Sequence, residues 1–362
     1  MRWGCDDEGM TAYNEAVSYL KRAEKRGRRF LNPVPTTVGG LGVVFKVLPQ
    51  YVNNTAEAEP KRPLGPFMTD VSGFAAMPAS GLRVTWFGHS ASLIEIDGMR
   101  VLVDPVWEQR ASPFSFMGPK RFFQPTMELD ALPEIDVVLI SHDHYDHLGA
   151  GTVRRLARVK ATAGARWVTS LGVGKRLRGF GVQAAQITEL DWTESVGVGA
   201  LKVTAWPSRH FSGRGLFDRF TTLWSSYVIE GPAHRVYFGA DSGWWEGFEE
   251  IAAQYEATAE RSGGFDLTML EIGAFHSLWD GIHLGPDNAA KAFASMGMRG
   301  GLLMPIHWGL FNLALHGWRQ PVERIVELAD EKEMKLWLPV PGTPSEVVPG
   351  VELRSGWWER EG

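Results

Sequence analysis

The segment VVLISHDHYDHLG, residues 137–149, constrains the fold of this chain more than any other stretch. The apolar run over residues 135–140 is typical of a strand that is buried on both faces. Four side chains suited to metal binding follow closely: His142, His144, Asp146 and His147. Imidazoles and carboxylates are ligands of zinc and similar divalent ions. The segment therefore predicts a metal site directly after a buried strand.

The spacing within this segment is compatible with two metal ions. Side chains alternate along an extended chain, so His142 and His144 project to the same side. Asp146 and His147 follow where the chain turns, and they can face a second point. One short loop could therefore serve two ions a few ångströms apart. The chain has only 10 His in 362 residues, so three in this loop are unlike a chance cluster.

Composition limits the classes of protein to consider. A hydrophobic content of 44% and a charged content of 22% are ordinary for a globular protein, and 362 residues suffice for one large domain or two. The net charge of −5 provides no basic field for nucleic acid, so we expect no nucleic-acid partner. The single cysteine, Cys5, excludes an intrachain disulfide and a Cys-rich zinc site. We expect a cytoplasmic location.

The N-terminal region suggests peripheral contact with a membrane. The first ten residues, MRWGCDDEGM, lack the apolar core of a signal peptide, and we expect no membrane-spanning segment. Apolar residues at helical spacing predict a helix from Thr11 to Arg26, whose other face carries Lys and Arg. That face is either solvated or lies on an anionic lipid surface. An apolar patch over residues 43–48 could add to such contact.

The pattern divides the chain into three parts. Residues 1–81 are expected to form an N-terminal helix and a Pro- and Gly-rich extended wrap, 82–341 the catalytic domain, and 342–362 a C-terminal tail. Asp97-Gly98 predicts a hairpin turn. Expected strands are 84–87, 92–96, 100–103, 135–141, 167–170, 201–206, 223–229, 235–238, 267–271, 301–305 and 335–338. Expected helices are 152–159, 173–178, 245–257, 287–296 and 321–331.

A second pattern extends the candidate site beyond the first loop. His142, His210, Asp241 and His307 each follow the end of an expected apolar strand. Loops at strand ends are where α/β folds place their chemistry. Any one of these residues could simply cap a strand, but four repetitions favour a shared site.

These residues resemble a known family. The HxHxDH pattern of residues 142–147, followed by a distant His, Asp and His, is similar to that of the metallo-β-lactamase-fold hydrolases. Longer stretches resemble the branch of N-acylphosphatidylethanolamine-hydrolysing phospholipase D. They are FLNPVPT at 30–36, GLRVTWFGHSAS at 81–92, MGPKRF at 117–122, YFGADSG at 237–243 and IHWG at 306–309. The resemblance covers about Phe30 to Pro341. It implies an α/β fold, a four-layer αββα sandwich with the site at the rim between two sheets.

The resemblance also implies roles for individual residues. Its seven ligand positions are all filled: His142, His144 and His210 for a first metal, Asp146, His147 and His307 for a second, and Asp241 as the bridge. His283 stands where the family has a pocket histidine, so it is a candidate for substrate contact. The expected catalytic residues are then Asp146, Asp241 and His283. His89 is expected to be structural, and Lys120 and Arg121 either hold a phosphate or are solvated loop charges.

The implied function is a phosphodiesterase with two divalent ions, zinc first among them, although iron and manganese also suit these ligands. Water activated by the ions would split a phospholipid into phosphatidic acid and an N-acylethanolamine. An apolar pocket could come from Phe114, Phe116, Trp244, Trp245 and Trp308.

Two other functions stay open. The same ligands suit a lactonase acting on a sugar-phosphate or acyl-homoserine lactone. A non-catalytic metal- or lipid-binding protein could use the same scaffold, although the complete ligand set argues against it. A nuclease has no support in the charge balance. The sequence leaves the oligomeric state open.

Overall fold

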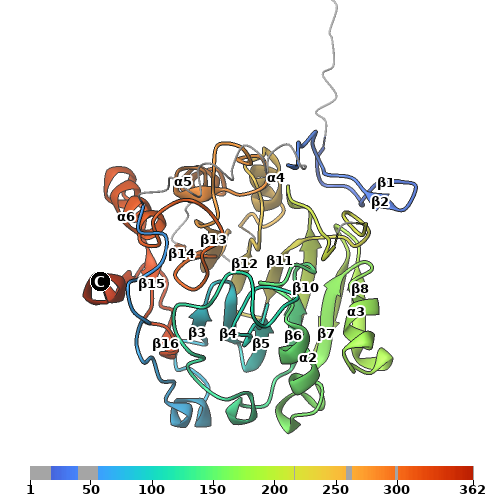
Figure 1. Ribbon diagram of the computed structural model, residues 1–362. Helices are drawn as coiled ribbons and strands as arrows, with labels where there is room; N and C mark the ends of the chain where they lie inside the picture. The colour runs from blue at the N-terminus through green and yellow to red at the C-terminus, as the bar shows by residue number, and fades with distance from the viewer. Residues whose placement is uncertain (1–17, 40–55, 216, 258–262, 298–300, 362) are drawn as a thin grey trace, which may run out of the picture.

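Two β-sheets lie back to back between outer helices (Figure 1). The computed structural model describes residues 18–39, 56–215, 217–257, 263–297 and 301–361. Within these ranges the arrangement confirms the predicted α/β class and the four-layer αββα sandwich. Most expected strands and helices from residue 82 onward are present, with ends that differ by a few residues.

The first sheet has seven strands in the described part of the chain, in the order β16-β3-β4-β5-β6-β7-β8. Its strands are β3 Leu82–Gly88, β4 Ala91–Ile96, β5 Met99–Val103, β6 Val137–Ile140, β7 Arg166–Ser170, β8 Ile187–Leu190 and β16 Ser345–Glu346. β3, β4 and β5 are antiparallel, whereas β5 to β8 are parallel. Asp97 and Gly98 have φ values of 49° and 84°, the conformation that the predicted Asp-Gly hairpin requires.

The second sheet has six strands among the described residues, in the order β14-β13-β12-β11-β10-β9. They are β9 Ser195–Val198, β10 Leu201–Trp206, β11 Ser226–Glu230, β12 Arg235–Phe238, β13 Leu267–Glu271 and β14 Leu302–Ile306. β12, β13 and β14 are parallel, so their carboxyl ends lie at one edge of the sheet. A small separate sheet pairs β15 Trp337–Leu338 with β17 Leu353–Arg354.

Alternation along β6 shows how the layers form. Val137 and Leu139 belong to the core between the two sheets, whereas Val138 and Ile140 belong to the core beneath the first-sheet helices. The helices are α2 Ala150–Leu156 and α3 Gly174–Gly179 on the first sheet, α4 Gly247–Ala253, α5 Gly285–Ser295 and α6 Gln320–Lys332 on the second, and the C-terminal α7 Trp357–Arg360. Among the described residues, no helix combines the length and apolar character needed to cross a bilayer.

The helix expected from Thr11 to Arg26 is wrong in its described part. Residues 18–24 are irregular, and β1 Lys25–Arg26 pairs with β2 Arg29–Phe30 in a hairpin. Residues 11–17 and the apolar patch 43–48 lie outside the described ranges.

Long-range contacts explain why residues 18–26 do not form the expected helix. The backbone N–H of Tyr19 donates to the Glu250 carboxylate (2.9 Å), and that of Ala23 to Asp191 (3.0 Å). These carboxylates satisfy donors that a helix would have satisfied internally. Glycine at position 27 has a φ of 61°, which suits the hairpin turn.

The division of the chain at residues 81 and 341 stays a prediction, but contacts cross both boundaries. Asn32 Nδ2 donates to the backbone carbonyl of His210 (2.8 Å), so the N-terminal segment lies against a predicted ligand. On the C-terminal side, β16 extends the first sheet by pairing with β3. Trp357 is buried and stacks on Trp308, with 5.3 Å between ring centroids. The residues after 341 therefore pack as part of the sandwich.

Candidate metal centre

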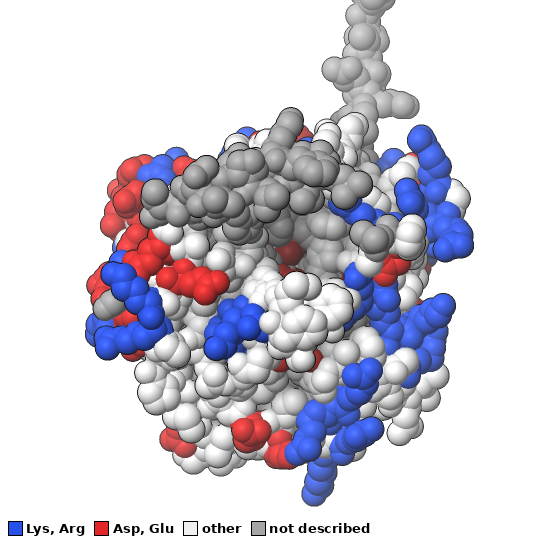
Figure 2. Space-filling model, viewed as in Figure 1, with Lys and Arg blue, Asp and Glu red and all other residues white. Residues whose placement is uncertain are grey.

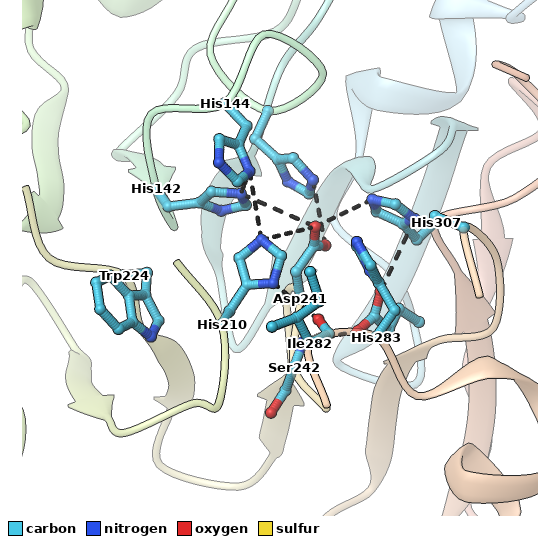
Figure 3. A network of polar contacts seen from close by, with 12 residues as sticks. His142, His144, His210, Trp224, Asp241, Ser242, Ile282, His283 and His307 are labelled. Atoms are coloured by element: carbon cyan, nitrogen blue, oxygen red, sulfur yellow. Dashed lines mark hydrogen bonds and ion pairs between the residues drawn. The ribbon is translucent and has the colours of Figure 1, made fainter. Parts of the chain in front are cut away.

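The predicted strand ends meet at one rim of the sandwich. The ends of β6, β10, β12 and β14 are followed by His142, His210, Asp241 and His307. The three imidazole side chains converge on the Asp241 carboxylate (Figure 3). Ala240 and His307 have positive φ values of 49° and 63°. Non-glycine residues rarely adopt this conformation, and it is concentrated at functional sites. The backbone is therefore held in an uncommon form where these side chains are aimed.

The first predicted ligand set forms one cluster. The ligand-capable atoms of His142, His144, His210 and Asp241 all lie within 4.8 Å of one another. His144 Nδ1 lies 2.8 Å from His142 Nε2 and 3.3 Å from His210 Nε2. Asp241 Oδ2 closes the cluster at 3.6 Å from His210 Nε2. The three imidazoles come from two separate loops, and the structure brings them to one point.

The second predicted set forms an adjacent cluster. Asp146 Oδ2 lies 3.5 Å from His147 Nε2 and 3.3 Å from His307 Nε2. His89 joins this group, with its Nε2 at 3.0 Å from Asp146 Oδ2. Burial and the neighbouring His307 lower the pKa of His89 to about 3, so its ring is neutral and can donate this hydrogen bond. The contact agrees with the prediction that His89 supports the site.

Asp241 lies between the two clusters, as a bridging carboxylate should. Its Oδ1 is 3.2 Å from His147 Nε2, and its Oδ2 is 3.1 Å from His307 Nε2. In the described part of the chain, these buried Nε2 atoms and Oδ1 have no hydrogen-bond partner. Buried polar atoms without partners are costly, and shared cations would satisfy them. The donor set therefore fits two divalent ions.

The charges of the site favour cations as well. Burial lowers the pKa of His142, and that of His210, well below the usual value, so both rings are neutral. Burial also disfavours a charge on His307, but the Asp241 and Asp146 carboxylates outweigh it and raise its pKa to about 10. The carboxylates thus attract positive charge into the space between the clusters, and metal ions can supply it.

Asp104 is a supporting residue that the sequence analysis missed. It follows β5, is fully buried and has a φ of 38°. Its Oδ2 lies 2.7 Å from His147 Nδ1 and accepts from Ser141 Oγ (2.5 Å), which in turn contacts His142 Nδ1 (2.9 Å). A carboxylate behind a histidine orients the ring and strengthens it as a ligand. The Asp104-Pro105 pair after a strand was the signal available in the sequence.

Glu271 is the second supporting residue missed. It ends β13, and its Oε2 lies 2.6 Å from His283 Nδ1. Its Oε1 accepts from the backbone N–H groups of Ser242 (2.6 Å) and Leu284 (3.2 Å). Glu271 thus ties the loop after Asp241 to the loop that carries His283. Asp241, Glu271, His283 and His307 form a third group whose ligand atoms lie within 4.8 Å.

A cavity of about 310 Å³ opens beside the clusters. His144, Asp146, Asp241, His283 and His307 line it, together with Val38 and Gly39 from the N-terminal wrap. Its apolar wall is formed by Phe211, Ala274, Trp279, Ile282 and Leu313, and Arg219 is its cation. His283, predicted to contact substrate, therefore does lie at the cavity.

The aromatic residues expected to form the pocket lie elsewhere. Trp245 and Trp308 are buried in the core, and Phe114 and Phe116 are exposed. Trp244 stacks on Phe248 away from the cavity lining. Their positions in loops predicted a pocket, but Trp244, Trp245 and Trp308 pack in or against the hydrophobic core instead.

Of the two basic residues considered for phosphate, neither lines the cavity. Arg121 is buried, and its Nε donates to the carbonyl of Phe123 (2.6 Å). That role is structural, so the phosphate assignment of Arg121 is wrong. Lys120 is exposed on the surface.

Comparison with known proteins identifies the family. The profile described as "Beta-lactamase superfamily domain" matches residues 99–308. This chain belongs to the β-lactamase superfamily. Among curated relatives, an uncharacterized protein of Mycobacterium tuberculosis is 44% identical over 298 residues, 82% of this chain and 77% of the relative. "N-acyl-phosphatidylethanolamine-hydrolyzing phospholipase D 1" of Caenorhabditis elegans is 34% identical over 264 residues, 70% of this chain and 71% of the relative.

Solved structures agree on the fold. A metallo hydrolase from the archaeon Ignicoccus hospitalis has a TM-score of 0.53 and 20% identity, covering 75% of this chain and 99% of that one. An isothiocyanate hydrolase from Delia radicum gut bacteria has a TM-score of 0.56 and 15% identity, covering 74% and 99%. These comparisons identify the chain as a metal-dependent hydrolase of the metallo-β-lactamase superfamily. Its resemblance to the phospholipase D branch is confirmed.

Proposed function

We propose that this protein hydrolyses a phospholipid on the phospholipase D side of the phosphate, releasing phosphatidic acid and an N-acylethanolamine. The observation that carries the proposal is the pair of His/Asp clusters joined by Asp241 beside a largely apolar cavity. The relatives named as N-acyl-phosphatidylethanolamine-hydrolyzing phospholipase D in Caenorhabditis elegans and Saccharomyces cerevisiae support the choice of substrate class.

The chain's own side chains would hold two ions, zinc being the expected metal. One would be bound by His142, His144 and His210, the other by Asp146, His147 and His307, and Asp241 would serve both. When bound, two divalent ions would polarise the phosphoryl group and lower the pKa of the attacking water. Asp104 and His89 keep the ligand side chains in their rotamers, so little reorganisation is needed during the reaction.

His283 would contact the substrate in this proposal. Its Nδ1 is held by Glu271 at 2.6 Å, so the ring is fixed and Nε2 is left for the cavity. Its ring centroid is 5.1 Å from that of His210 and 5.4 Å from that of His307. With the Nδ1 hydrogen donated to Glu271, Nε2 of the neutral ring could accept a hydrogen bond from a hydroxyl of the substrate or of the product alcohol.

The remaining cavity wall suits a phosphate that carries an apolar chain. Phe211, Trp279, Ile282 and Leu313 offer apolar surface to hydrocarbon. Arg219 adds a cation, which is held by donation from its Nη1 to the carbonyl of Gly39 (2.9 Å). Since Gly39 belongs to the N-terminal wrap, the wrap both forms the wall and positions its charge.

The test is product analysis in ¹⁸O-water with purified, metal-analysed protein. The substrates are N-acylphosphatidylethanolamine, phosphatidylcholine and a set of lactones. We expect ¹⁸O in the phosphate of phosphatidic acid and an unlabelled alcohol, because water attacks phosphorus. The matched control is His144→Ala, which should lose bound metal and product together.

Other outcomes would redirect the proposal. Label in a carboxylate, or turnover of lactones without turnover of diesters, would make the protein a lactonase. Two bound metals without turnover of any substrate would favour a non-catalytic binding protein.

A further inference from the structure

The loop between β5 and β6 carries an exposed apolar bulge that the catalytic site does not use. This bulge consists of Phe114, Phe116 and Met117, whose side chains are 46%, 76% and 54% exposed. The rings of Phe114 and Phe116 lie against each other, with centroids 5.6 Å apart. Single exposed apolar side chains are common on protein surfaces. A cluster of exposed aromatic side chains on one loop, in contrast, usually marks a contact surface.

The base of this loop is anchored, so the bulge is held out from the body of the protein. Ala111 N–H donates to the carbonyl of Pro119 (3.0 Å), and Phe122 N–H to that of Leu310 (2.8 Å). The second bond joins the loop to the segment that follows His307. Figure 1 shows the teal segment between β5 and β6 crossing the front of the sandwich. The bulge therefore has a fixed position relative to the metal centre.

A hollow of about 770 Å³ lies beside the bulge, and arginines dominate its charge. Arg110, Arg154, Arg176 and Arg214 line it, together with Phe114 of the bulge. Arg176 is paired with Asp143 (2.6 Å) and Asp218 (2.7 Å). The Glu108 carboxylate also lines the hollow, but it accepts from the backbone N–H and hydroxyl of Thr152. We call this feature the arginine hollow.

Three of the four arginines keep their charge unpaired. Within the described ranges, Arg110, Arg154 and Arg214 have no carboxylate partner, and neither does Lys120, whose backbone pairs with that of Arg110. Arg214 Nη1 donates instead to the backbone carbonyls of Asp143 (2.8 Å) and Leu148 (2.7 Å). Arg214 lies 3.8 Å over the ring of Tyr145. Figure 2 shows Lys and Arg side chains on both sides of the uncharged surface at the centre of this face, with most acidic side chains at the upper left and a few along the lower edge. The hollow is thus complementary to anions.

The arginine hollow and the catalytic cavity share a wall. Tyr145 and Gly149 line the hollow, whereas His144 and Asp146 of the same loop line the cavity. A partner surface that binds at the arginine hollow therefore lies next to the metal centre. Phe217, 89% exposed, extends from the loop that carries Arg214 and adds apolar surface on that side.

We propose that the bulge and the arginine hollow together dock this protein on an anionic phospholipid bilayer. Phe116 and Met117 enter the interface between headgroups and acyl chains, and Arg110 and Arg154 bind lipid phosphates. A bilayer fits both features at once, because it presents apolar depth beneath a sheet of negative charge. The inference rests on the proposed lipid substrate and adds the surface by which the enzyme reaches it.

The test is flotation of the full chain with phosphatidylcholine vesicles that contain or lack phosphatidylglycerol. We expect binding only with phosphatidylglycerol, weakening as salt increases. The double variant Phe116→Ser/Met117→Ser should bind about tenfold more weakly, since it removes apolar area from the interface. Lys120→Gln and Arg154→Gln should each lower binding about fivefold at low salt and reduce its salt dependence.

Matched controls are Met68→Ser, which alters a side chain that is 75% exposed outside the bulge, and Lys202→Gln on β10. Both should bind like wild type, and thermal unfolding verifies that every variant is folded. Equal binding to neutral vesicles, no binding, or equal loss in the controls would overturn the proposal. So would loss of self-association in the bulge variants without any vesicle binding.

Two further readouts separate the alternatives. If soluble dihexanoyl phosphatidylglycerol binds the hollow but vesicles do not, the ligand is a dispersed phosphodiester and bilayer docking is wrong. Vesicle binding without hydrolysis of any diester would retain the docking surface and reject the proposed function. Hydrolysis of dispersed diesters without vesicle binding would retain the proposed function and reject the docking surface.

Discussion

The half of the metal centre on the first sheet comes mostly from one loop, whereas the half on the second sheet comes from separate strand ends. His142, His144, Asp146 and His147 follow β6 within a few residues. Asp241, Glu271 and His307 follow or end β12, β13 and β14, which are far apart in the chain. Parallel pairing aligns them: Phe238 is in register with Met269, and Met269 with Met304.

The comparison teaches that the two halves depend on different information. The loop of the first half encodes its spacing locally, so its ligands approach one another as soon as the strand ends. The second half exists only when three strands pair in the correct register, because a slip of one residue would turn the side chains to the opposite face. Each half also has one buried carboxylate behind its histidines, Asp104 or Glu271.

The largest effect is expected where the two halves meet. Asp241→Asn removes the carboxylate that faces both clusters, leaving His147 and His307 without their shared anion. We expect loss of both metals and a decrease in turnover of about a thousandfold or more, since several kcal/mol of charge stabilisation disappear. Elemental analysis and a diester assay measure the two together. Full activity with unchanged metal content would show that Asp241 is not the bridge.

The supporting carboxylates separate the halves. Asp104→Asn should weaken metal binding about 10- to 100-fold, because His147 loses the partner that orients its ring. Glu271→Gln should lower turnover about 10- to 100-fold and change metal affinity less, because its partner His283 is predicted to contact substrate.

Chelator competition measures metal affinity, and steady-state kinetics measures turnover. If Glu271→Gln loses metal as readily as Asp104→Asn, the third group with His283 is itself a metal site, and the two halves are alike.

The smallest effect is expected at an ion pair outside the metal centre that also joins the two sheets. Asp97, in the β4–β5 turn, accepts from His234 N–H (2.8 Å) and Ala233 N–H (2.7 Å), and its Oδ1 lies 2.6 Å from His234 Nδ1. Burial raises the pKa of Asp97, but the bonds from His234 and Ala233 outweigh it and the pKa is lowered. Such a carboxylate contributes stability above its unfolded pKa of about 3.9 and loses it as the pH falls through the lower folded value.

Asp97→Asn should therefore lower the unfolding temperature by a few degrees at pH 7. Asparagine tolerates the positive φ at this position, so the turn is kept. The difference from wild type should narrow as the pH falls below about 4, because the unfolded carboxyl is protonated there, and it should vanish below the lower pKa of the folded state. Thermal unfolding across pH measures it, and metal content at neutral pH should not change. A gap that widens on acidification would contradict the assignment.

Much of this protein was determined by local sequence. The alternation of apolar residues predicted β6 and most other strands from residue 82 onward, and the Asp-Gly pair predicted its hairpin. The dense histidine loop indicated two metals. These features depend on neighbours along the chain, so the sequence contains the physics that produces them.

Tertiary structure decided what depends on distant partners. The basic segment 18–26 has helical spacing but forms a hairpin edge, because Glu250 and Asp191 capture its backbone donors. Arg121 has the charge for phosphate but is used to bind a buried carbonyl. Asp104 has only the Asp-Pro pair after a strand as a local signal and Glu271 has none, and both gain their roles only when folding places them behind His147 and His283. A hydrogen bond between residues far apart in sequence has no local period, so only the fold could reveal it.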